Sequence, residues 1–317
     1  MSTDPGPPDA LPAEVAGIRI GERIRTAGPL AVFAGTDALG LAVRLHVVRT
    51  AALGAPSESD AFLDRVRRAA RAQHPSLAPI TTGGRSADLV YAVARDAEGR
   101  ALDELLGRGG ALATERALGI AVAIAEVLAA LEGAGLRHGD LTPRRVLLPG
   151  RGMVVVRPPR LLPARLQPPK PRYQAPEEAR GGDGDIRSDL YVLGLIVVEM
   201  LTGESPVKGA DPAAVLAAGL PPVAKLLPGV AAPVARAVAG LLATEPRARH
   251  ATAAAAAAAL AAAARGEAPE APPEDVPVAV PLDEERPETA PIAPAAVAQA
   301  LAAARGEAPP PAPAVAA

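Results

Sequence analysis

The spacing of apolar residues divides the chain near residue 99. Before this point, short segments alternate apolar and polar residues, and this period of two predicts β-strands. One helix is expected over 57–73, with Ser59 or Asp60 as its capping residue. Strands are expected within 18–49 and over 77–80 and 89–94.

Beyond residue 99 the apolar residues mostly recur with a helical period. Helices are expected over 102–106, 114–131, 188–202, 211–218, 232–243 and 253–264, with a short strand pair at 146–148 and 153–156. The polyalanine run 253–264 has a high helix propensity and is expected to form a solvated terminal helix. This order predicts an α+β fold, with a small β-rich part around one helix over 17–97 and a larger, mostly helical part over 98–265.

The two ends of the chain differ from the rest in composition. Residues 1–16 are rich in Pro, Asp and Gly, and residues 266–317 are rich in Pro, Ala and Glu, so both segments are expected to be disordered. Within the second, residues 300–309 nearly repeat residues 259–269. Slippage in repetitive DNA explains this repeat, and so does a duplicated helix that docks on the domain or on a partner.

Charge and cysteine content exclude several classes of function. The net charge is −2, of which residues 266–317 carry −7 and the remainder +5, so nothing attracts the chain strongly to nucleic acid or to an anionic membrane. There is no Cys, which excludes disulfides and thiolate metal sites. The longest apolar runs fall short of the roughly 20 residues that a membrane span needs. We therefore expect a cytoplasmic protein that binds neither nucleic acid nor membrane.

The most informative segment is residues 138–148, which read His-Gly-Asp-Leu-Thr-Pro-Arg-Arg-Val-Leu-Leu. It resembles the catalytic loop of protein kinases, His-Arg-Asp-Leu-Lys-Pro-x-Asn-Val-Leu-Leu. Other segments match family motifs and occur in the family's order along the chain. They are residues 74–75 and 98–102 before this loop, and residues 173–177, 188–194 and 201–206 and Arg249 after it. Together they identify residues 17–265 as similar to a bacterial serine/threonine protein kinase domain. The resemblance implies a two-lobed fold, with the hinge near residues 95–97.

The residues that hold the kinase scaffold together are present. The resemblance implies that His138 packs inside the catalytic loop and that Asp189 anchors the backbone of this loop. It also implies a buried ion pair between Glu177 and Arg249. Asp140 stands at the position of the catalytic base and is interpreted as an inactive relict that serves as a structural partner of Arg145 or of nearby backbone amides.

The residues that handle phosphate and metal in the family are replaced. The glycine-rich phosphate loop retains only Gly28, followed by Pro29, which has no N–H to donate. The replacements at the other family positions are Arg44 for the strand Lys, Arg65 for the helix Glu that pairs with it, Gly139 for the Arg before the catalytic Asp, Thr142 for the loop Lys, Arg145 for the magnesium-binding Asn, and Pro158-Pro159-Arg160 for Asp-Phe-Gly. Arg44 and Arg65 would repel each other where the family has an ion pair. A unit charge about 4 Å from another repels it by roughly 4 kcal/mol at an effective dielectric of about 20, so a metal ion beside Arg145 is not expected.

These losses indicate a catalytically inactive kinase homologue, a pseudokinase, that serves as a scaffold or allosteric regulator of a protein partner. No cofactor and no metal are expected, and ATP binding is expected to be weak at most. One alternative is a divergent kinase that uses Asp140, with Arg44 and Arg145 holding ATP. Another is a nucleotide sensor in which Arg44, Arg65 and Arg145 bind phosphate without a metal.

Residues 158–177 correspond to the family's activation segment. They contain no Ser or Thr that could be phosphorylated, but seven Pro and several basic residues, among them Arg165, Lys170 and Arg172. A stiff, extended strip is expected. The strip is interpreted either as a docking surface for an acidic partner or as a solvated loop.

Overall fold

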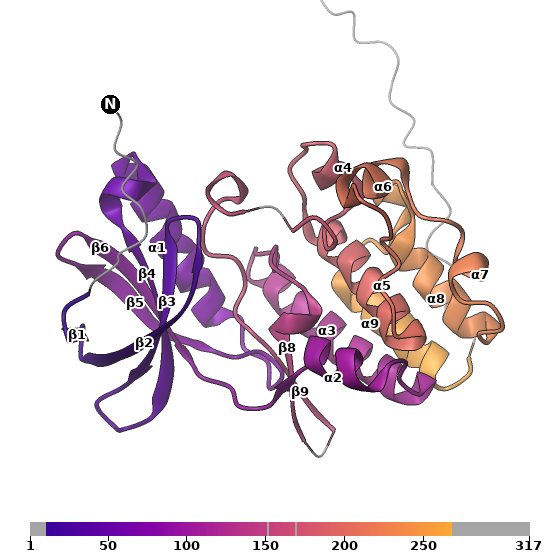
Figure 1. The fold of residues 1–317 in the computed structure, drawn as a ribbon, viewed down its shortest axis with the longest axis horizontal. Helices are drawn as coiled ribbons and strands as arrows, with labels where there is room; N and C mark the ends of the chain where they lie inside the picture. Colours follow the sequence, from indigo (N-terminus) through magenta and orange to yellow (C-terminus); the bar gives the residue numbers. More distant parts are fainter. Residues whose placement is uncertain (1–10, 151, 169, 268–317) are drawn as a thin grey trace, which may run out of the picture. The chain divides into compact units, whose positions relative to one another are not determined.

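The computed structural model describes residues 11–150, 152–168 and 170–267 (Figure 1). They form two lobes joined at residues 95–100, which confirms the two-lobed kinase-like fold expected from the sequence. The tail expected to be disordered lies outside the described residues from 268 onward, and so do residues 1–10. No helix in the described part of the chain is both long enough and apolar enough to cross a membrane.

An antiparallel sheet with one helix forms the N-terminal lobe. Its elements are β1 (Glu14–Val15), β2 (Ile18–Ala27), β3 (Leu30–Thr36), β4 (Ala42–Arg49), α1 (Pro56–Arg71), β5 (Ile80–Ser86) and β6 (Leu89–Arg95), and the strand order is β1-β2-β3-β4-β6-β5. Because side chains alternate along a strand, Val43, Leu45 and Val47 of β4 lie in one apolar cluster and Val48 lies in another with α1. The central strand β4 therefore has buried apolar side chains on both faces of the sheet, whereas β2 is largely exposed.

Three local predictions about this lobe were wrong. The expected loose segment 1–16 includes β1, which pairs with the start of β2. Helix α1 begins at Pro56 and has no side-chain cap. Ser59 and Asp60 cannot cap it because they lie within the helix, where Ser59 is buried and Asp60 pairs with Arg85 at 2.7 Å. The strand expected over 77–80 begins only at Ile80.

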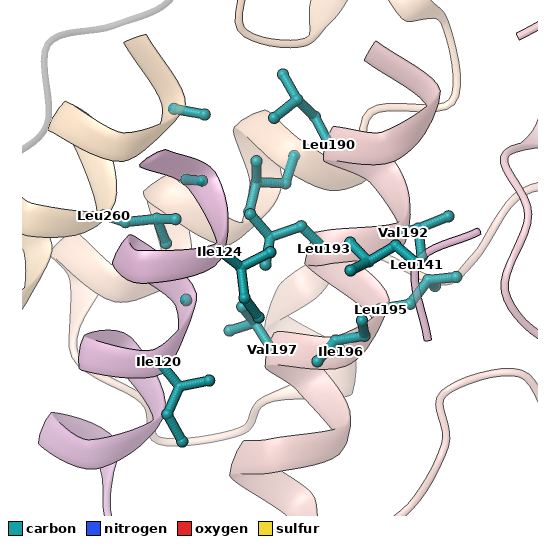
Figure 2. Packing of buried hydrophobic residues seen from close by; sticks show 14 of the residues in the cluster. Ile120, Ile124, Leu141, Leu190, Val192, Leu193, Leu195, Ile196, Val197 and Leu260 are labelled. Carbon is teal, nitrogen blue, oxygen red and sulfur yellow. The ribbon is translucent and has the colours of Figure 1, made fainter. Parts of the chain in front are cut away.

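Helices make up most of the C-terminal lobe. Its elements are β7 (Arg100–Ala101), α2 (Leu102–Gly109), α3 (Thr114–Gly133), β8 (Val146–Gly150), β9 (Met153–Val156), α4 (Pro176–Ala179), α5 (Ile186–Thr202), α6 (Pro212–Ala218), α7 (Val223–Leu226), α8 (Ala232–Leu242) and α9 (Ala253–Ala264). Figure 2 shows the centre of this lobe, where α3 and α5 face each other through side chains such as Ile124 and Val197. We call residues 138–148 the catalytic-type loop. Its Leu141 lies in the same cluster, so the loop is attached directly to the core.

The polyalanine helix α9 is part of this core, and the expectation of a solvated terminal helix was wrong. It packs against α3 and α8, and Ala256 and Leu260 are fully buried. Alanine side chains are small enough for the helix backbones to approach closely, which a periodicity analysis of a uniform alanine run cannot reveal. The carboxylate of Glu132 in α3 accepts a hydrogen bond from the Ala253 N–H at 2.9 Å and fixes the start of α9.

This packing can be tested with one substitution at two positions of α9. Ala256→Glu would place an unpaired carboxylate in the core, and we expect it to lower the free energy of unfolding by about 3 kcal/mol or more. Ala258→Glu is the matched control, because Ala258 is exposed. Urea denaturation measures both, and equal effects of the two variants would contradict the packing of α9 on α3.

Candidate functional site

Helix α5 holds the backbone of the catalytic-type loop in place. The carboxylate of Asp189, in the first turn of α5, accepts hydrogen bonds from the N–H groups of His138 at 2.5 Å and Gly139 at 2.9 Å. Burial raises the pKa of Asp189 to about 6, although the backbone donors act against this shift. Asp189 therefore makes the hydrogen bonds to the loop backbone that the resemblance implied.

His138 lies inside the loop and is fully buried. Its Nδ1 accepts a hydrogen bond from the Asp140 N–H at 3.1 Å, and its Nε2 lies 3.0 Å from the Arg157 carbonyl oxygen. These partners require the tautomer in which Nε2 carries the proton. Burial and the nearby Arg145 charge lower the pKa of His138 to about 3, so the ring is neutral and its contacts are structural.

The carboxylate of Asp140 is buried and surrounded by cations. It forms ion pairs with Arg145 and with Lys170, and the guanidinium of Arg25 lies 3.8 Å away. The Lys170 ammonium also donates a hydrogen bond to the Gly139 carbonyl oxygen at 3.1 Å. Three segments, namely β2, the catalytic-type loop and the activation segment, thus meet on one carboxylate.

The positions that bind magnesium in the family hold Arg145 and Pro158, and Arg157 lies next to the second. In the family, the Asn of the catalytic loop and the Asp of Asp-Phe-Gly bind the metal ions together. Here β8 pairs with β9 so that Arg157 stands opposite Arg145, and the Arg157 N–H donates to the Arg145 carbonyl oxygen at 2.9 Å. Arg157 directly precedes Pro158, which stands at the position of the metal-binding Asp, so the backbone of a second arginine lies against that of Arg145.

These residues do not fit a magnesium ion. Magnesium requires oxygen ligands, but Arg145 and Arg157 end in guanidinium groups, which carry only donors, and Pro158 has no polar side-chain atom. Within residues 11–150, 152–168 and 170–267, no group of three His, Cys, Asp or Glu side chains could hold a metal. The expectation that no metal is bound here remains a prediction from the chemistry of these side chains.

Arg44 stands at the position of the family's strand lysine, which pairs with a glutamate of the helix that corresponds to α1. It pairs instead with Asp96, just after β6, with Nε and Oδ1 2.5 Å apart. Arg65 of α1 has a buried Nη1 without a hydrogen-bond partner in the described part of the chain. Asp64 pairs with Arg68 at 2.8 Å, so it does not compensate the charge of Arg65.

The turn between β2 and β3 is closed against the activation segment. Gly28 has a φ of +58°, and a Cβ added there would overlap the carbonyl oxygen of Leu166. Only glycine therefore permits this contact and this backbone conformation. The turn that covers the nucleotide phosphates in the family here covers the protein's own backbone.

The activation segment, residues 158–177, is anchored at several of its described residues. Leu161 and Leu162 are buried in the apolar cluster of α1 and the sheet, and Arg165 forms an ion pair with Glu58 of α1. Arg172 donates to the Val207 carbonyl oxygen and the Tyr173 hydroxyl donates to Glu199 at 2.8 Å.

One of the two interpretations of this strip needs correction. The segment is not a fully solvated loop, because Leu161 and Leu162 are buried. The docking surface for an acidic partner stays a prediction, and the charged groups of Arg165, Lys170 and Arg172 already have partners within the described chain.

Glu177 and Arg249 form the pair that the resemblance implied. Arg249 donates two hydrogen bonds of 2.8 Å to the two carboxylate oxygens, and its guanidinium lies 4.9 Å from the ring centre of Tyr191. Burial acts to raise the pKa of Glu177, but hydrogen bonds from Arg249 and Ser188 hold it below its usual value. This pair fastens the end of the activation segment to the region before α9.

A family model for protein tyrosine and serine/threonine kinases matches residues 42–219. The chain belongs to the protein kinase family. Among its relatives, the probable serine/threonine-protein kinase PknB of Corynebacterium glutamicum is 28% identical over 254 residues, which are 73% of this chain and 39% of that protein. PknB of Mycobacterium tuberculosis is 28% identical over 273 residues, or 77% of this chain and 44% of that protein.

The chain therefore spans less than half the length of these relatives. Among solved structures, the PknI kinase domain of M. tuberculosis superimposes with a TM-score of 0.64 at 22% identity, covering 81% of this chain and all of that domain. This likeness shows the kinase fold.

Three residues of the site were not found from the sequence. Arg25, Asp96 and Lys170 come from strands and loops far apart in the chain, and they meet Asp140 or Arg44 only after folding. Lys170 was noted as one of several basic residues, but no local pattern indicated its partner.

The Glu177–Arg249 pair is expected to stabilise the domain. Arg249→Lys keeps the charge but loses the two parallel hydrogen bonds, and we expect it to lower the free energy of unfolding by roughly 2–4 kcal/mol. Arg247→Lys is the control, since Arg247 is exposed two residues away. Urea denaturation compares them, and a change below about 0.5 kcal/mol for Arg249→Lys would be inconsistent with a stabilising pair.

The contact between Lys170 and Asp140 is expected to hold the activation segment down. In Lys170→Met the segment loses this anchor, so trypsin should cleave after Arg165 and Arg172 several-fold faster than in the unaltered chain. Lys208→Met, which removes an exposed lysine paired with Glu204, should leave these rates unchanged. Mass spectrometry of timed digests measures both, and equal rates in Lys170→Met and the unaltered chain would refute the anchor.

Proposed function

We propose that this chain is a pseudokinase domain, which transfers no phosphate and acts as a scaffold or allosteric regulator of a protein partner. The observation that carries the proposal is the state of Asp140. Its carboxylate is in ion pairs with Arg145 and Lys170, so it is not free to accept a proton from a substrate hydroxyl.

The surroundings of Asp140 support the same proposal. Phosphoryl transfer depends on positioning and on charge stabilisation by metal ions. Arg145 and Arg157 offer no ligand for such an ion, and the Gly28 turn lies on the activation segment. A substrate hydroxyl approaching Asp140 would have to displace the Lys170 ammonium.

The retained contacts support a role in binding. Asp189 and the Glu177–Arg249 pair maintain the helical lobe and the path of the activation segment. A fold that is kept in shape without its phosphate-binding groups is suited to present surfaces to another protein. The partner is an unidentified protein, and we propose no contact with nucleic acid or membrane.

The competing function is that of a divergent serine/threonine kinase. One residue favours this function. Asp140 stands at the family's catalytic position, on a loop whose backbone is anchored by Asp189. This function would require Lys170 to leave Asp140 and the Gly28 turn to open.

A phosphotransfer assay separates the two functions. We expect the unaltered chain, given radiolabelled ATP, magnesium and a general protein substrate, to transfer no more label than Asp140→Asn, because the carboxylate is already engaged. The PknB kinase domain serves as the active control. Magnesium-dependent transfer that disappears in Asp140→Asn would replace the pseudokinase by the divergent kinase.

A further inference from the structure

A cavity in the helical lobe is separate from the contacts around Asp140. It has a volume of about 390 Å³, and we call it the α5–α7 cavity because the end of α5, the short helices α6 and α7 and the loops between them enclose it (Figure 1). None of the residues in ion pairs with Asp140 lines it. Sites for small molecules commonly have volumes of roughly 300–1,000 Å³, so one small ligand fits here.

The walls of the α5–α7 cavity are mostly apolar. The apolar side chains that line it are Val198, Pro206, Val215, Leu220, Pro221 and Leu226. Val198 is buried, whereas Val215, Leu220 and Leu226 are half-buried and pack against the core of the lobe. Because these three side chains still contact water, a ligand that covered them would gain free energy from apolar burial.

Charged side chains line the same cavity and give it a positive balance. They are two lysines, Lys208 and Lys225, and one carboxylate, Glu204. Lys208 pairs with Glu204 at 2.6 Å, but the two side chains are 72% and 69% exposed, so this pair is weak. Lys225 is exposed and forms no ion pair with another described residue. An anionic group at the cavity would therefore be attracted, above all by Lys225.

The apolar surface at this place suits a small molecule better than a protein. A standard protein interface covers about 800 Å² on each partner. The large apolar side chains that are most exposed in the described chain lie on other elements, at Ile24, Leu39, Leu41 and Met153. The apolar part of the α5–α7 cavity is thus an isolated hollow beside cationic groups, which matches one hydrocarbon chain that ends in an anion.

We infer that the α5–α7 cavity binds a single-chain amphiphile with a carboxylate head, such as a medium-chain fatty acid. The hydrocarbon chain would lie against Val215, Leu220 and Leu226, and the carboxylate would pair with the ammonium group of Lys225. This inference goes beyond the proposed function and does not depend on it, because no residue of the cavity takes part in the contacts of Asp140.

Isothermal titration calorimetry of the full chain tests the contribution of the hydrocarbon chain. The probes are hexanoate, octanoate and decanoate, each kept below its micellar concentration. We expect decanoate to bind at one site, and the affinity to rise roughly fourfold for each methylene group that the cavity covers. No saturable binding of decanoate, or equal affinities of the three probes, would overturn the inference.

A change of the head group tests the contribution of the charge. Decyltrimethylammonium has a hydrocarbon chain of the same length as decanoate, but its head is positive. It should bind at least about fivefold more weakly than decanoate, because repulsion by the lysines replaces attraction. Equal binding of the two probes would mean that the cavity does not select an anion, and the inference would fail.

Variants link the binding to this cavity. Lys225→Glu reverses the charge of an exposed side chain and should weaken decanoate binding about fivefold or more, whereas Arg67→Glu, the same reversal at an exposed position of α1, should leave it unchanged. Val215→Asp places a carboxylate in the apolar wall and should abolish binding. Thermal melts without ligand establish which variants fold, and Lys225→Glu alone suffices if Val215→Asp does not.

The remaining outcomes separate a site from adsorption. Equal loss of binding in Lys225→Glu and Arg67→Glu, or binding of many decanoate molecules that neither variant changes, indicates non-specific adsorption and overturns the inference. These results leave the proposed function as it stands, since phosphate transfer is measured with other probes and depends on Asp140.

Discussion

The contacts among β2, the catalytic-type loop and the activation segment depend on the charge of Asp140. Its single carboxylate lies within ion-pairing distance of cations from the N-terminal lobe, the catalytic-type loop and the activation segment. Without it, Arg25, Arg145 and Lys170 would face one another in a partly buried space, where repulsion between charges is weakly screened. The residue that performs proton transfer in the family thus acts here as the counter-ion that joins three segments.

Two kinds of contact then fix the activation segment. Apolar contacts place Leu161 and Leu162 among the buried residues of α1 and the sheet. Polar contacts attach it at Arg165 near the N-terminal lobe and at Tyr173 near α5. Because both lobes contribute, the segment links them, and the Gly28 turn rests on it. A change that freed this segment would alter both lobes, which is the property that an allosteric domain requires.

The core of the helical lobe does not depend on the charged contacts around Asp140. Its core is built on α3, α5, α8 and α9, and it is held by the hydrogen bonds of Asp189 and by the Glu177–Arg249 pair. None of these contacts needs a nucleotide or a metal. This independence gives a physical account of how the fold persists while the phosphate-binding residues have been replaced.

Much of the fold was determined by local patterns in the sequence. The alternation over 18–49 and the helical period over 114–131 and 188–202 correspond to elements whose apolar faces are buried, and the motifs around Asp140 and Asp189 were sufficient to predict two lobes. Spacing alone failed for α9, since an alanine run has no polar face that would reveal its buried side.

The candidate site was decided by the tertiary structure. The sequence indicated which family residues are missing, but not which charges meet. Arg25 and Lys170 lie 145 residues apart in the chain and reach the same carboxylate only because β2 and the activation segment close over one loop. Likewise, the pairing of β8 with β9 brings the Arg157 N–H to the Arg145 carbonyl oxygen. Contacts between distant segments depend on the packing of whole lobes, and no local pattern of residues encodes them.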